Sequence, residues 1–141
     1  SQPILRYRLN DVLRLATQPC SCGSEFRVIE EIEGRCDDLC YFYTQDAQER
    51  PFFPDTLRRM ILLADSRITD YRVIQERPGQ LHIFLALADG APYLDIQQAV
   101  QRSVEQIIAQ YHCSPAILEI SEGLPTLAPL AKRRRVQRIQ S

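Results

Sequence analysis

One short stretch near the start of this chain carries residue types that could bind the sugar of a nucleotide. It reads YRLND over residues 7–11, and Asp11 follows a run that alternates apolar and basic residues. An aspartate where a strand gives way to a turn can accept hydrogen bonds from both hydroxyls of a ribose. An ordinary turn residue beside a solvated strand face has the same pattern, and the spacing alone favours that second interpretation.

A second stretch, GRCDD over residues 34–38, combines a planar cation with two acidic residues. The guanidinium of Arg35 could bind phosphate or ribose oxygens through its fork of N–H donors. A glycine followed by Asp37 and its neighbour could form a hinge that absorbs a large backbone change. The alternative is a surface turn whose local ion pair contributes less than about 1 kcal/mol.

The cysteines offer a third kind of chemistry. Cys20 and Cys22 stand in PCSCG, a loop by its Pro, Gly and Ser content. Thiolates bind zinc, but structural zinc sites use four ligands and wider Cys spacing, so free thiols are the alternative. No export signal precedes the odd total of five cysteines, so we expect no disulfides. The full set is Cys20, Cys22, Cys36, Cys40 and Cys113.

Basic residues crowd into the last ten positions, and Lys132 is the first of them. A lysine ammonium can stabilise negative charge that accumulates in a transition state. The same residues could instead form a solvated tail, contact RNA or a membrane surface, or return to a sheet as a strand containing Val136. His82 and His112 have no partner at catalytic spacing, which favours structural roles for both.

Composition narrows the class of protein. With 141 residues, 45% of them apolar, the chain can bury one sizeable core. Its net charge of -1 does not favour nucleic acid as a partner. No apolar run reaches the roughly 20 residues of a membrane helix. The start has no signal-peptide pattern and resembles an interior strand, so we expect a cytoplasmic protein and a chain cut from a longer one.

The hydrophobic periodicity predicts an α+β fold in two parts. Residues 1–37 are β-rich, with strands expected over 4–9, 12–15 and 26–32. Residues 38–141 predict a ferredoxin-like β-α-β-β-α-β unit, an antiparallel sheet with two helices on one face, followed by an extended basic C-terminal arm from residue 124. The expected elements of this unit are strand 39–43, a polar loop 45–50, a helix from Pro54, strands 68–76 and 81–87, a helix 95–111 and strand 116–121.

The ordered motifs resemble one family. YRLND, PCSCG and GRCDD look like the Tyr-Arg-x-x-Asp motif, the Pro-Cys-x-Cys-Gly loop and the Gly-Arg-x-Asp-Asp hinge of the phenylacetate–CoA ligase group, and in particular of a branch of adenylate-forming enzymes within it. Each motif alone is weak, but their order and spacing together are specific. The resemblance covers nearly the whole chain, because the family's C-terminal lid is also a β-α-β-β-α-β unit.

The resemblance implies roles for individual residues. Residues 1–37 would end the large AMP-binding domain, and residues 38–141 would form its mobile lid. Asp11 would bind the AMP ribose, and Arg35 would contact ribose or phosphate. Asp37 would be the pivot of the lid, and Lys132 would bridge the carboxylate substrate and the α-phosphate.

The resemblance also implies substrates and partners. The complete enzyme would activate an aryl or acyl carboxylic acid with ATP and Mg²⁺ as acyl-AMP, with CoA as one acceptor, and it would need a large N-terminal domain that this chain lacks. Zinc at Cys20 and Cys22 could take further ligands from that domain. Ala131 stands where the family has glycine, and residues 43–50 lack the glycine of the loop that lines the CoA tunnel. The acceptor therefore stays open between CoA, a carrier protein and another group.

Two other classes of function fit the pattern. A stand-alone ferredoxin-like domain could bind a small ligand or regulate a partner without catalysis. A nucleic-acid binder could use the basic arm, although strand 81–87 offers Phe84 as its only aromatic residue for stacking on bases. The sequence names neither the carboxylic acid nor the oligomeric state.

Overall fold

The computed structural model describes residues 11–35, 39–126 and 134–139. The chain divides into two compact units, Ser1–Asp37 and Asp38–Ser141. We call them unit 1 and unit 2 and describe each by itself.

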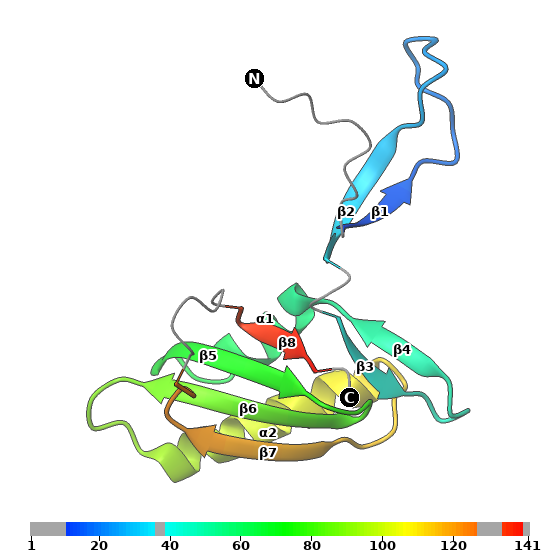
Figure 1. Ribbon diagram of the computed structural model, residues 1–141. Helices are drawn as coiled ribbons and strands as arrows, with labels where there is room; N and C mark the ends of the chain where they lie inside the picture. Colours follow the sequence, from blue (N-terminus) through cyan, green and yellow to red (C-terminus); the bar gives the residue numbers. More distant parts are fainter. Residues whose placement is uncertain (1–10, 36–38, 127–133, 140–141) are drawn as a thin grey trace. The chain divides into compact units, whose positions relative to one another are not determined.

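Unit 1 contains a two-stranded antiparallel ribbon of β1 (Asp11–Leu15) and β2 (Ile29–Arg35), drawn in blue and cyan in Figure 1. The strands pair with two register irregularities, and Leu13 lies opposite Ile32. Ile32 is 65% exposed and Ile29, opposite Leu15, is 51% exposed. An isolated two-stranded ribbon is at best marginally stable in water, and the described residues of this one bury little apolar surface.

Unit 2 is an α+β unit, which confirms the predicted class and is consistent with a small ferredoxin-like domain. Two helices accompany six strands in the part of this unit that is described. Pro54 begins the first helix, where its fixed φ suits the first turn, and Asp95 lies in the first turn of the second. The elements are β3 (Cys40–Tyr43), β4 (Glu49–Phe52), α1 (Pro54–Leu62), β5 (Ile68–Gln75), β6 (Gln80–Leu87), α2 (Tyr93–Gln110), β7 (Ile117–Glu122) and β8 (Val136–Arg138).

The main sheet of unit 2 is mixed rather than antiparallel. Its strand order is β7-β6-β5-β8 (Figure 1). The β5–β6 pair is antiparallel, whereas β7 runs parallel to β6 and β8 runs parallel to β5. The sequence analysis left several alternatives open for the basic residues near the C-terminus. The structure shows that the segment containing Val136 returns to the sheet as the short edge strand β8.

The prediction that strand 39–43 joins this sheet is wrong, and the polar loop predicted over 45–50 ends earlier, because Glu49 and Arg50 begin β4. β3 pairs with β4 instead, with Cys40 opposite Phe52, and residues 44–48 form a short hairpin loop. Closing so short a loop loses little chain entropy, so local pairing is favoured over a distant partner.

The core of unit 2 lies between the helices and one face of the sheet, and Figure 1 shows α2 crossing behind the strands. α2 buries Ile96, Val100, Val104 and Ile108, whereas Tyr111, just after its end, is 46% exposed. Burying one large aliphatic side chain contributes about 1.5–3 kcal/mol, so this cluster accounts for much of the stability of unit 2. Other fully buried members are Leu57, Met60, Ile61, Val73, Ile83 and Leu85.

Candidate functional site

The backbone of unit 1 brings the two predicted nucleotide-binding residues together. Asp11 begins β1 and Arg35 ends β2, and the two are partners in the antiparallel register. Opposed residues in such a pair have Cα atoms about 5 Å apart. Residues separated by more than twenty positions in the sequence thus occupy the same end of the ribbon.

The cysteine loop connects the two strands of the ribbon. Cys20 Sγ and Cys22 Sγ lie 2.8 Å apart, and the amide of Gly23 donates to the carbonyl of Cys20 at 3.0 Å. The hydrogen bond from Cys20 lowers the pKa of the Cys22 thiol, and a backbone hydrogen bond from Ser24 adds to the effect. Among the described residues, no group of three or more His, Cys, Asp or Glu side chains could hold a metal ion. Zinc binding by Cys20 and Cys22 therefore stays a prediction, because the described residues supply no third ligand beside them.

Lys132 and Asp37 lie outside the described residues, so their predicted roles stay predictions. The chain that follows Lys132 is nevertheless well anchored. The guanidinium Nε of Arg72 donates to the carbonyl of Arg134 at 3.1 Å, and the amide of Val73 donates to the carbonyl of Arg135 at 2.7 Å. These bonds hold the start of the last described segment against β5.

A cavity of about 190 Å³ adjoins this anchor. Asp70 accepts a hydrogen bond from Arg135 Nε at 2.9 Å on its wall. Burial raises the pKa of Tyr71, the phenol that also lines it. The sequence analysis did not single out Asp70, Tyr71 or Arg72, because polar and apolar residues mix along β5 and none of the three stands out. The lining residues are Asp70, Tyr71, Arg72, Leu124, Pro125, Arg134 and Arg135.

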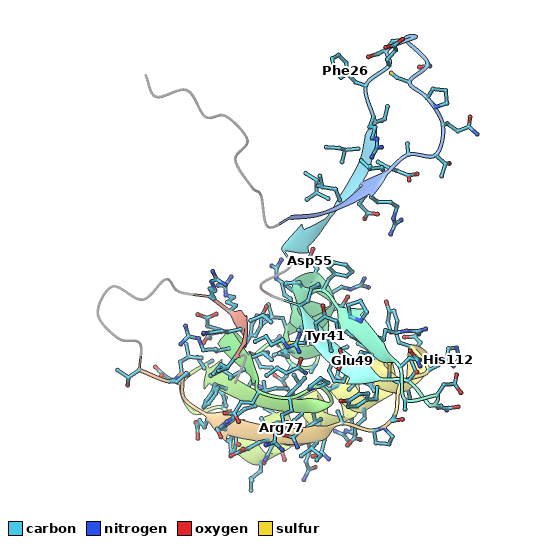
Figure 2. All side chains as sticks on the ribbon, turned by 45° about the vertical axis from the view of Figure 1, so that its right-hand side comes forward. Phe26, Tyr41, Glu49, Asp55, Arg77 and His112 are labelled. Atoms are coloured by element: carbon cyan, nitrogen blue, oxygen red, sulfur yellow. The ribbon has the colours of Figure 1, made fainter. Side chains whose placement is uncertain are left out.

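The β3–β4 hairpin is fastened to the main sheet by Gln75, a fully buried amide. Its Oε1 accepts from the amide of Tyr41 at 2.7 Å, and its Nε2 donates to the Tyr41 carbonyl at 3.0 Å. The guanidinium of Arg138 lies over the ring of Tyr41, which Figure 2 labels, with its Cζ 4.6 Å from the ring centroid. The hairpin, β5 and β8 therefore meet at one partly buried polar junction that the sequence analysis did not identify.

The loop of this hairpin contains a strained residue. Ala47 has φ +57°, in the left-handed region that favours glycine. The amide of Ala47 donates to the Thr44 carbonyl at 3.0 Å, and the amide of Thr44 donates to the Gln48 carbonyl at 2.8 Å. The turn thus forms without a glycine, at the cost of backbone strain.

The structure supplies structural partners for one of the two histidines. His82 Nε2 lies 3.0 Å from Ser121 Oγ, and the imidazole stacks on Phe84 with ring centroids 3.9 Å apart. His112 follows the end of α2 with φ +58°.

Comparison with known proteins gives a likeness of fold. No family model matches the chain, and no curated protein matches it. Two structures of 2-hydroxyisobutyryl-CoA ligase in the postadenylation state, one with R3-HIB-AMP and one with 2-HIB-AMP, match with TM-scores of 0.53 and 0.52. The chain has the fold of a part of this ligase.

The likeness extends over both units. The matches cover 94% of this chain at 17% identity, and the chain spans 28% of the length of the ligase. At this identity the likeness establishes the fold alone. No helix in the described part of the chain is long and apolar enough to cross a membrane.

Proposed function

We propose that this chain is the carboxyl-terminal part of an ATP-dependent adenylate-forming ligase of the phenylacetate–CoA ligase-like group. The observation that carries the proposal is the likeness of fold to 2-hydroxyisobutyryl-CoA ligase over 94% of the chain. It includes both the ribbon and the α+β unit, and the three ordered motifs fall in the same stretch. The remaining parts of the enzyme would belong to a longer protein.

The Asp11–Arg35 pair would be half of the AMP site. The Asp11 carboxylate would accept hydrogen bonds from the ribose hydroxyls, and Arg35 would donate to ribose or phosphate oxygens. Their opposition across the ribbon supports this assignment, because a nucleotide at that end would be within reach of both.

The exposed apolar side of unit 1 supports a large domain as its partner. Leu13 and Leu15 are each 40% exposed, and their cross-strand partners are more exposed still. A ribbon with this surface would be buried as the last strands of a larger domain. Burial of these apolar side chains would then stabilise the contact between unit 1 and the rest of the large domain.

Lys132 would act during attack of the carboxylate substrate on the α-phosphate of ATP. Its ammonium would stabilise the negative charge that accumulates there, and Mg²⁺, held by residues of the longer protein, would supply further neutralisation of phosphate charge. Asp37 would be the joint about which unit 2 rotates to bring Lys132 to the site and withdraw it. The anchoring of residues 134–135 on β5 gives the segment that follows Lys132 a fixed base.

The product of this step would be an acyl-AMP, and the substrate an aryl or acyl carboxylic acid. Transfer to CoA would follow if the site admits it. The tight turn at Ala47 leaves a glycine-free loop in the region where the family lines its CoA tunnel, so a carrier-protein thiol or another acceptor is an equal candidate.

The decisive experiment measures carboxylate-dependent exchange of pyrophosphate into ATP by the longer protein. Lys132→Ala should lower the exchange rate about 10²- to 10³-fold, the usual loss when one group that stabilises transition-state charge is removed. The matched control is Arg58→Ala, which removes a cation from the exposed side of α1. The control should keep its activity, and both variants should unfold at the temperature of the unmodified protein.

The chain of 141 residues alone should not catalyse the exchange, because the bulk of the nucleotide and acid pockets would lie elsewhere. Exchange by this chain unaided, or full activity of Lys132→Ala, would contradict the proposal. Saturable binding of a small ligand by the chain alone would favour a stand-alone binding module.

A further inference from the structure

The loop at the end of the unit 1 ribbon places two sulfur atoms in contact. Cys20 Sγ and Cys22 Sγ are 2.8 Å apart. The hydrogen bond from the Gly23 amide to the Cys20 carbonyl closes a four-residue β-turn, with Cys20 first and Cys22 third. This local turn, rather than packing against distant elements, brings the two thiols together.

Access separates this pair from the other described cysteines. Cys22 is exposed and Cys20 is partly exposed, whereas Cys40 and Cys113 are buried. Figure 2 shows neighbouring Phe26 at the same end of the ribbon, and its side chain is 87% exposed. A small molecule in solution can therefore reach the loop. Thiol–disulfide exchange requires such access.

We propose that Cys20 and Cys22 form a redox-active dithiol, which closes to a disulfide by exchange with a small-molecule disulfide. The sulfur of one cysteine attacks the small disulfide, forms a mixed disulfide and releases one small thiol. The sulfur of the other cysteine then attacks the mixed disulfide, forms the Cys20–Cys22 bond and releases a second small thiol. The chain loses two hydrogen atoms, and the small disulfide is reduced to two thiols.

This inference goes beyond the proposed function and does not rest on it, since it uses only the loop of unit 1. It also differs from the expectation that the cysteines stay reduced, because a disulfide between neighbours in an exposed loop is readily made and broken. Such a bond would change the loop reversibly without cross-linking distant parts of the chain.

The test equilibrates the purified, reduced chain in glutathione buffers of increasing oxidised fraction. Free thiols are then alkylated under denaturing conditions, and the chain is digested with trypsin. The peptide over residues 15–27 contains Cys20 and Cys22 and no other cysteine. We expect it to lose both alkylation sites together and to weigh two hydrogens less than its reduced form. Cys113, on a different peptide, should stay alkylatable throughout and serves as the internal control.

Three variants test whether disulfide formation depends on the geometry of the turn or only on the presence of two thiols. Gly23 has φ +78°, and a Cβ there would meet no atom within 4 Å, so Gly23→Ala strains the turn and nothing else. It should raise the ratio of oxidised to reduced glutathione at the midpoint roughly fivefold. Ser21→Ala, in the same turn, should leave the midpoint unchanged. Cys22→Ser should stop at the mixed disulfide on Cys20.

Three outcomes would overturn the proposal. The first is a peptide that keeps both thiols, or carries only glutathione adducts, at every ratio. The second is an unchanged midpoint in Gly23→Ala. The third is a purified chain that holds stoichiometric zinc and loses it in Cys20→Ser, because the thiols would then be ligands.

Discussion

In unit 1 the apolar side chains of both strands are largely exposed, whereas the central strands of unit 2 bury Val73, Ile83 and Leu85 completely. Unit 1 is a ribbon with no core of its own among its described residues, and unit 2 closes a core between helices and sheet. The difference teaches that unit 2 draws its stability from its own packing, whereas the described ribbon of unit 1 buries little apolar surface within itself. Substitutions should therefore have unequal effects in the two units.

The largest difference should come from truncating apolar side chains. Ile83→Ala in unit 2 should lower the free energy of unfolding by about 3 kcal/mol, because it leaves a cavity in a close-packed core. Ile32→Ala in unit 1 should change it by less than about 0.5 kcal/mol, since that side chain is already mostly exposed. Urea unfolding followed by circular dichroism measures both. Equal losses would show that the ribbon belongs to the same cooperative unit.

The β1–β2 ribbon of unit 1 and the β3–β4 hairpin of unit 2 should differ in how strongly a single buried side chain holds them. The β3–β4 hairpin is docked by Gln75, so Gln75→Leu should leave the Tyr41 amide without its acceptor and lower stability by about 2 kcal/mol. Hydrogen exchange at Tyr41 should accelerate, whereas the β1–β2 ribbon should exchange as before. Gln101→Leu on the exposed side of α2 is the control and should change little. Unaltered exchange at Tyr41 would mean that Gln75 does not hold the hairpin.

Substitutions at residues with positive φ should change the free energy of unfolding by a smaller amount, which can have either sign. Ala47→Gly and His112→Gly should each raise the free energy of unfolding by about 0.5 kcal/mol, because relief of strain outweighs the added freedom of the unfolded chain. Gly79→Ala, at φ +76° and beside the Tyr43 ring, should lower it by about 1 kcal/mol. Thermal unfolding measures the change in stability for all three variants. Gly23→Ala in unit 1 should leave the transition of unit 2 where it was.

The smallest effect should appear in acid. Arg67 holds Asp65 through two side-chain hydrogen bonds and its own amide, which lowers the pKa of Asp65 to about 2. Because the pKa is depressed in the folded state, the stabilisation is fully present above about pH 4 and is lost as the pH falls toward 2. Asp65→Asn should flatten this part of the stability profile in denaturant unfolding.

The matched variant for the acid prediction lies in unit 1. The pair of Arg14 and Glu31, 3.2 Å apart, joins two side chains that are each 56% exposed. Surface pairs of this kind contribute little, so Glu31→Gln should leave the profile unchanged. A profile for Asp65→Asn identical to that of the unmodified chain would contradict the role of the Asp65–Arg67 contact.

Much of the local structure could be predicted from the sequence. Both helices and the strands β5, β6 and β7 lie within a few residues of their predicted bounds, because the spacing of apolar residues distinguishes a helix from a strand directly. Pro54 and Asp95 marked the two helix starts. The candidate nucleotide-binding residues Asp11 and Arg35 came from motif order, and their pairing across the ribbon followed only from the register.

The rest could not be predicted because it depends on contacts between distant residues. Gln75 looked like one more strand residue, and its function as an acceptor for Tyr41 depends on where the hairpin docks. Arg72 gave no sign of its bond to the Arg134 carbonyl, which joins positions separated by 62 residues. Lys132 and Asp37 keep the roles that the family resemblance implies, as predictions for the longer protein.

The sequence by itself therefore determined both helices and the strands β5, β6 and β7, where the helices begin and which motifs occur in what order. These properties depend on neighbours within a few positions, through periodicity, capping and turn chemistry. Only the tertiary structure decided that β3 pairs with β4, that β8 completes a mixed sheet and that Asp11 is paired with Arg35 in the strand register. Strand pairing is made by backbone hydrogen bonds that any residue but proline can donate, so competition among all the strands for core and partners sets it.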